Sequence, residues 1–188
     1  QGIDIGGQGE LGGVGQAVRS IVKSKIIFIG TPELDAKKFG RRDRRRGYAK
    51  RHHFRIPRQI KVPGYPAPIH PMTRTLGSSR TGVFIVTEAM HPQMQKYRVR
   101  YLHLAAVKPG LKAGDIVEAG EELGLMGATA IMVSAPHVHI DVETRKGIRF
   151  NPAHLLGLDK IYSARCRAIN KRAVANWRRR HRRRNRAR

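Results

Sequence analysis

The chain has 188 residues and a formal net charge of +25, from 38 Lys and Arg against 13 Asp and Glu. This length is enough for one core with additions. No apolar run approaches the roughly 20 residues that a membrane-spanning helix needs, and a single cysteine, Cys166, excludes both an internal disulfide and a thiolate metal site.

The positive charge is concentrated in two segments. Residues 41–61 contain ten Lys or Arg and one acid, Asp43, while residues 160–188 contain thirteen Lys or Arg and no acid. The remainder carries fifteen basic and twelve acidic residues. We therefore expect a nearly neutral core with two basic attachments that bind an anionic partner: nucleic acid, an envelope polymer or an acidic protein. The side chains expected to make these contacts are Arg41, Arg42, Arg44, Arg45, Arg46, Arg178, Arg179, Arg180, Arg182, Arg183 and Arg184.

The first thirty residues have the pattern of β-strands. Residues 14–29 are rich in Val, Ile and Phe, with Gly15 and Gly30 near the two ends, which predicts strands and not a helix. Asp4 stands between Ile3 and Ile5, so in an extended segment its side chain points away from the packed face.

A basic insertion is predicted at about residues 31–80, where the strand pattern gives way to Pro, Gly and basic residues. It would leave the core after the strand that ends near Ile29 and return at a strand over residues 82–88. Tyr48, Phe54 and Tyr65 interleave with the basic residues. Two interpretations stay open: stacking of the rings on nucleic-acid bases, or a solvated loop whose rings pack on the core.

Histidines occupy two predicted strands in the second half of the chain. His103 lies in the run 98–105, and His137 and His139 lie two residues apart in the sequence PHVHI. Alternate side chains of a strand share a face, so His137 and His139 are predicted to project together while Val138 and Ile140 pack the other way. The Gly-punctuated segment between the two runs predicts short strands and tight turns that could place the runs side by side.

A C-terminal helix is predicted over residues 160–177, followed by an Arg-rich tail at residues 177–188. The expected organisation is a core at residues 1–157, including the insertion, and a basic helix and tail at residues 158–188. Because the sequence lacks an initiating Met, we expect a processed product or a fragment.

Three blocks of the sequence resemble the lysostaphin-type zinc endopeptidases, which cut peptide cross-links in bacterial cell walls. Residues 2–5 (GIDI) look like the end of that family's first motif, H-x-G-x-D, whose His aligns with the position immediately before Gln1. Residues 101–104 (YLHL) look like its middle motif, and residues 136–139 (PHVH) look like its closing H-x-H. The resemblance covers roughly residues 1–30 and 80–156.

The resemblance implies a fold, a metal and a division of roles. The fold would be mainly β, an antiparallel sheet core with the basic insertion and the basic C-terminal helix and tail attached. Asp4 and His139 would bind zinc together with the first-motif His. His103 and His137 would lie beside the metal as catalytic residues that position or deprotonate water and stabilise the oxyanion.

The expected function is zinc-dependent hydrolysis of peptidoglycan cross-links, in a phage virion or at the bacterial cell envelope. A second hypothesis is a catalytically degenerate peptidase fold that acts as a structural assembly protein, with basic segments that bind nucleic acid or neighbouring virion subunits. The residue before Gln1 discriminates between them, since a His there favours the enzyme.

Overall fold

The computed structural model describes residues 2–7, 11–31, 34–35, 56–72, 74–75, 81–94, 97–130, 136–150 and 152–153. The chain divides into two compact units, Gln1–Phe150 and Asn151–Arg188. Of the second unit only residues 152–153 are described, so the predicted boundary at 157/158, the predicted helix and the Arg-rich tail lie outside the described residues. The described part of the chain contains no helix with the length and apolar character needed to span a membrane.

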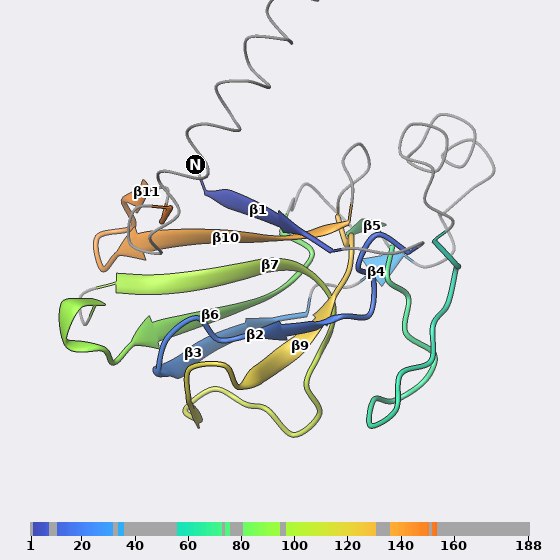
Figure 1. The fold of residues 1–188 in the computed structure, drawn as a ribbon, viewed down its shortest axis with the longest axis horizontal. Coiled ribbons are helices and arrows are strands. Elements are labelled where there is room, and N and C mark those ends of the chain that lie inside the picture. Colours follow the sequence, from blue (N-terminus) through green and yellow to red (C-terminus); the bar gives the residue numbers. More distant parts are fainter. Residues whose placement is uncertain are drawn as a thin grey trace, which may run out of the picture. The chain divides into compact units, whose positions relative to one another are not determined.

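The described part of the first unit is built around one antiparallel sheet of nine strands, which confirms the predicted mainly β fold (Figure 1). Its main path runs β1-β10-β7-β6-β3-β8, with β11 on β10, β9 on β7 and β2 on β9. The bounds are β1 Ile3–Gly6, β2 Ala17–Arg19, β3 Ser24–Gly30, β6 Val83–Ala89, β7 Tyr97–Val107, β8 Ile116–Val117, β9 Glu122–Met126, β10 His137–Thr144 and β11 Arg149–Phe150. Two short strands, β4 Leu34–Asp35 and β5 Arg74–Thr75, pair separately, and a 3₁₀ turn, η1, covers Pro92–Met94.

The long strand β7 connects two parts of this sheet. Its first part pairs with β6 and β10, and its last residues, Leu104–Val107, pair with β9. The apolar side chains between these parts form the core, and Tyr101 is fully buried there, where its hydroxyl accepts a hydrogen bond from the Ile21 amide (3.0 Å). Burial raises the pKa of Tyr101 to about 12, so the phenol stays neutral.

Part of the predicted insertion packs on the core. Residues 56–72 contain a bridge between Ile60 and Ile69, and Ile69 is buried against Ala105 and Leu125. Tyr65 packs on the same cluster and donates a hydrogen bond from its hydroxyl to Glu122 (2.6 Å). The ring of Tyr65 therefore packs on the core, whereas Tyr48 and Phe54 lie outside the described residues.

Replacing Ile69 by Ala tests this anchor. The deletion should lower the free energy of unfolding by about 2–5 kcal/mol, because it removes buried methyl groups and leaves a cavity. Ile116→Ala is the matched control, since Ile116 is 55% exposed and its truncation should cost less than about 1 kcal/mol. Urea unfolding of both variants measures the difference. Equal losses would show that residues 56–72 do not hold to the core.

Candidate metal and catalytic site

The strand β10 presents a row of polar side chains on one face. Its apolar residues Val138, Ile140 and Val142 are buried and point to the other side. The polar residues take the alternate positions, as the period of a strand requires. This row consists of His137, His139, Asp141 and Glu143.

The neighbouring strand β1 brings Asp4 directly opposite His139. The Asp4 Oδ1 atom lies 2.6 Å from His139 Nδ1 and 3.5 Å from His137 Nε2. The hydrogen bond from His139 holds the pKa of Asp4 below its usual value, so the carboxylate is ionised at neutral pH. An ionised carboxylate beside two imidazoles is a donor set that suits a divalent metal ion.

Gly2 lies against the ring of His139. A Cβ atom at Gly2 would overlap His139 Nε2, would lie 2.7 Å from its Cε1 and would lie 2.9 Å from the backbone oxygen of Ile140. The φ angle of Gly2 is 153°. A side chain at this position would therefore displace the imidazole or the edge strand, which explains why a glycine precedes Asp4 by two residues.

A β-bulge moves His103 to the face that carries the β10 row. Leu102 pairs with His139, so simple alternation would place His103 on the opposite face, with the buried Tyr101. However, the register between β6 and β7 shifts so that Leu102 and His103 both lie opposite Phe84. His103 has a φ of 68°, which is uncommon for a residue other than glycine. Bulges that redirect a side chain in this way are common next to active sites.

As a result the three predicted histidines lie together. The ring centroid of His103 is 5.3 Å from that of His137 and 6.2 Å from that of His139, each pair edge to face. The structure thus brings together Asp4, His103, His137 and His139, the four residues that the sequence motifs single out. Their division into metal ligands and catalytic residues stays a prediction.

The hydrogen bond of His103 determines its tautomer. Its Nδ1 lies 3.0 Å from the backbone carbonyl oxygen of Thr129, which can only accept, so Nδ1 carries the proton and donates. Burial lowers the pKa of His103 to about 4, so the ring is neutral at neutral pH. In that neutral ring Nε2 has a free lone pair and can accept a proton.

Asp141 extends the row behind His139. Its Oδ2 lies 3.8 Å from His139 Nε2 and 3.4 Å from the guanidinium of Arg100, and both Asp141 and Arg100 are buried. Burial raises the pKa of Asp141, and the Arg100 charge opposes this change. Its Oδ1 has no hydrogen-bond partner among the described residues. Sequence reasoning missed Asp141, although its position two residues after His139 predicts the same face.

The donor atoms of Asp4, His137 and His139 fit a zinc ion. These three side chains each offer one ligand atom, and the atoms lie within 4.8 Å of one another. Two nitrogens and one carboxylate oxygen are a set that zinc accepts. The geometry therefore admits His137 as a ligand as well as the predicted pair, Asp4 and His139.

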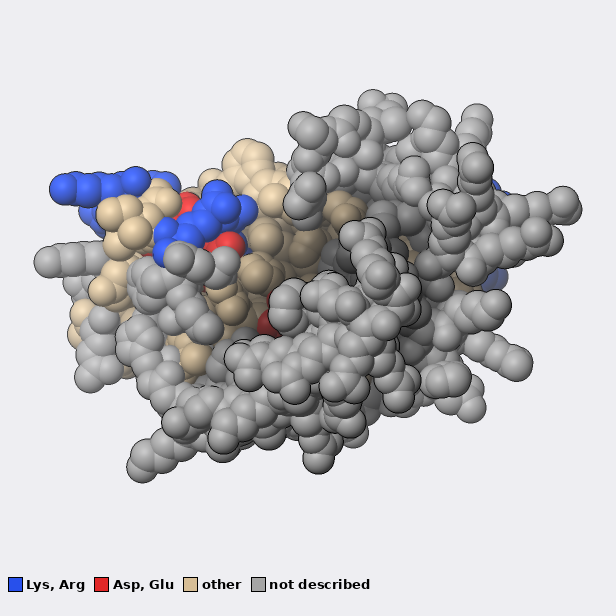
Figure 2. Space-filling model, turned by 90° about the horizontal axis from the view of Figure 1, so that it is seen from above, with Lys and Arg blue, Asp and Glu red and all other residues tan. Residues whose placement is uncertain are grey.

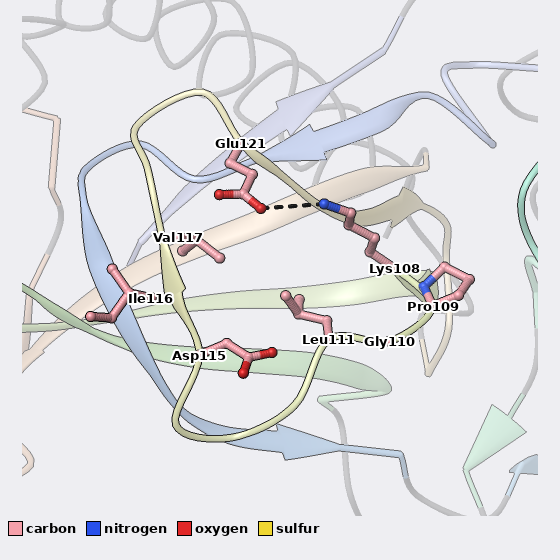
Figure 3. A pocket seen from close by; sticks show the side chains of 8 residues that line it. All are labelled: Lys108, Pro109, Gly110, Leu111, Asp115, Ile116, Val117 and Glu121. Atoms are coloured by element: carbon pink, nitrogen blue, oxygen red, sulfur yellow. Dashed lines mark hydrogen bonds and ion pairs between the residues drawn. The ribbon is translucent and has the colours of Figure 1, made fainter.

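The remaining predicted residues lie elsewhere. Arg41, Arg42, Arg44, Arg45 and Arg46 of the insertion, and the six Arg of the tail from Arg178 to Arg184, fall outside the described residues. A hollow of about 390 Å³ lies under the loop between β7 and β9, where Lys108 and Glu121 form an ion pair at 3.3 Å (Figure 3). None of the four site residues lines it.

Comparison with known proteins agrees with the motifs. Residues 76–152 match the model of peptidase family M23. The resemblance to the lysostaphin-type peptidases is confirmed. The M23 segment contains His103, His137, His139 and Asp141, whereas Asp4 comes from the strand before it. No curated protein sequence matches the chain significantly.

Solved structures similar to this chain include three at low sequence identity. A point mutant of the catalytic domain of EnpA, a prophage-encoded M23 protein from Enterococcus faecalis, is 14% identical, with a TM-score of 0.46 over 80% of this chain and 74% of that one. The catalytic domain of lysostaphin from Staphylococcus simulans is 19% identical, with a TM-score of 0.42 over 84% and 90%. A zinc-containing peptidase from Vibrio cholerae is 20% identical, with a TM-score of 0.29 over 70% and 38%.

Gly2→Ala tests the geometry of the site. The added Cβ should displace the His139 ring and weaken zinc binding by about tenfold or more. Losses of this size are usual when a group that orients a metal ligand is changed. Gly6→Ala at the other end of β1 is the control, because the nearest atom to its added Cβ would be the Pro136 backbone oxygen at 3.8 Å. Competition with a chromogenic chelator gives both affinities. Equal affinities in the two variants would contradict the placement of His139 in the metal site.

Proposed function

We propose that this chain is a zinc-dependent endopeptidase that hydrolyses peptide cross-links of bacterial peptidoglycan. The observation that supports it best is the convergence of Asp4, His103, His137 and His139 on one face of the sheet, three of them inside the M23 segment. A carboxylate and imidazoles in this arrangement provide both a metal site and a proton acceptor.

Asp4 and His139 are two of the metal ligands in this proposal. Asp4 is ionised, and the His139 nitrogen that faces it is the one nearest the shared site. When bound, zinc lowers the pKa of a water molecule toward about 7 and polarises the substrate carbonyl. The buried pair Asp141 and Arg100 lies behind the other ring nitrogen of His139 and restrains that ring, as carboxylates behind ligating histidines commonly do.

His103 is the proton acceptor. Its Nδ1–H is engaged by Thr129, so Nε2 is the free base that can take a proton from the attacking water. The same nitrogen then delivers this proton to the leaving amine as the peptide C–N bond breaks. His137, whose ring is the nearer of the two to His103, donates a hydrogen bond to the oxyanion that develops on the carbonyl oxygen.

Metal removal and two substitutions test this division of roles. A chelator and His139→Ala should each remove zinc and abolish wall hydrolysis, since a ligand is lost. His137→Ala should keep the metal and lower turnover by on the order of 100-fold or more, the usual contribution of one proton-transfer or oxyanion group. Zinc content by mass spectrometry and release of soluble muropeptides are the measurements. Equal zinc loss in both histidine variants would make His137 a ligand and not a catalytic residue.

We further propose that the basic segments hold the enzyme on an anionic polymer at the cell envelope or in a phage particle. The proposal is supported by the sequence, in which twenty-three of the 38 Lys and Arg fall in residues 41–61 and 160–188. Acidic and basic side chains lie next to one another in the described core (Figure 2). Two such pairs are Arg145–Glu88 (2.9 Å) and Arg149–Glu143 (3.4 Å). One-sided charge is thus a property of the attachments.

Replacing the eight Arg between Arg178 and Arg188 by Gln, with Trp177 kept, tests the tail. Binding to an anionic polymer should weaken and its salt dependence should become shallower, because fewer counterions are released. Cleavage of a small soluble peptide should be unchanged. A melting curve serves as the control, since a large shift would assign the tail to the fold. Unchanged polymer binding at low salt would overturn the proposed role.

A further inference from the structure

The fully buried Thr129 joins three segments of the fold next to the β7 bulge. Its hydroxyl donates a hydrogen bond to the backbone oxygen of Leu104 (2.8 Å) and accepts one from the backbone N–H of Val83 (2.9 Å). Val83 and Leu104 are partners across β6 and β7. The hydroxyl therefore bridges these two strands at the position directly after His103, where it both donates and accepts a hydrogen bond.

The backbone on either side of Thr129 is also held. The N–H of Ala128 donates to the Pro71 oxygen (2.7 Å), which belongs to the segment that packs on the core. Gly82, with a φ of 63°, lies so close that a Cβ there would overlap the Thr129 hydroxyl and come within 2.8 Å of its carbonyl carbon. The Thr129 carbonyl thus has little freedom to turn.

This carbonyl is the group that accepts the Nδ1–H of His103. The backbone N–H of His103 is in turn bonded to the Thr81 oxygen (3.1 Å), so the ring and the main chain of the bulge are held by two neighbouring segments. An imidazole whose Nδ1–H is held by a fixed carbonyl has its Nε2 lone pair directed to the opposite side, toward the ring cluster with His137 and His139.

We propose that Thr129 is a positioning residue: through its hydroxyl it fixes the carbonyl that sets the orientation and the tautomer of His103. Removing the hydroxyl leaves the Leu104 oxygen and the Val83 N–H without their bridge, and the Thr129 backbone shifts to satisfy them in another way. The catalytic consequence rests on the proposed function, because His103 acts as a base only if the site hydrolyses peptide bonds. The tautomer itself is independent of that activity.

The test compares Thr129→Val, which keeps the shape and removes the hydroxyl, with Thr129→Ser, which keeps the hydroxyl. In the zinc-loaded parent, ¹⁵N spectra of the imidazoles should show His103 with a protonated Nδ1 and a bare Nε2. In Thr129→Val the ¹⁵N chemical shifts of His103 Nδ1 and Nε2 should be averaged between the two tautomers or should correspond to the other tautomer. Thr129→Ser should give the same spectrum as the parent. On peptidoglycan, kcat should fall by on the order of 10-fold to 100-fold in the Val variant, because a catalytic group displaced by a fraction of an ångström loses about this much rate. KM and zinc content should be unchanged.

Thr87→Val is the matched control, because Thr87 is equally buried on β6 but pairs with Val99 on the core face, away from the site. It should leave the His103 spectrum and kcat as in the parent. If Thr129→Val does not fold, Thr129→Ala removes the hydroxyl without placing a second methyl group between the two backbone groups. An unaltered His103 tautomer in the hydroxyl-free variant, or an equal change in Thr87→Val, would overturn the inference. A parent without wall hydrolysis would overturn the proposed function, while the spectra would still decide the role of Thr129.

Discussion

One extra residue in β7 creates the site. Without the bulge opposite Phe84, the strand would alternate regularly and His103 would point into the core beside Tyr101. A residue with a side chain at a φ of 68° costs of order 1–3 kcal/mol, so the surrounding structure must hold it there. The contacts that do so are the bond from the His103 amide to Thr81, the bond from its ring to Thr129, and the Thr129 hydroxyl between the two strands.

The second constraint is the cost of placing charge along β10. Asp141 and Arg100 are both buried, and ions taken from water destabilise a fold unless they are paired. Their mutual contact, with Glu143 also 3.8 Å from the guanidinium, offsets part of this cost. Because Asp141 lies behind His139, the ion pair restrains the ring that Asp4 meets from the other side. Asp4 is exposed, so a metal ion can reach its carboxylate from solvent.

The sequence predicts the elements whose pattern is local. The alternation in HVH predicts one face for His137 and His139, and the Ile residues around Asp4 place its side chain away from the packed face, so these parts of the site follow from the sequence alone. The same alternation extends to Asp141, which sequence reasoning missed. The convergence of His103 with them is different, because it depends on a register shift between two strands distant in sequence. Nothing in YLHL marks a bulge, and alternation alone predicts the wrong face.

Thr129 is a second residue whose role the sequence does not reveal. It stands in a Gly-rich connection where a threonine is an ordinary residue, and its importance arises from backbone groups of β6 and β7 that only the fold brings to it. Likewise, the sequence leaves open whether the rings of the insertion stack on nucleic-acid bases or pack on the core. Tyr65 packs on the core with Ile69, because Ala105 of β7 and Leu125 of β9 form an apolar surface there. Packing of this kind requires the tertiary arrangement.

Anomalous diffraction from crystals of the zinc-loaded protein would locate the metal relative to Asp4, His103 and His139. We expect a zinc peak at about 2.0–2.2 Å from an Asp4 oxygen and a His139 nitrogen, with the Nε2 of His103 facing the open side of the metal. A zinc ion bound away from these two side chains, or a His103 ring turned from the metal into the core, would contradict this expectation.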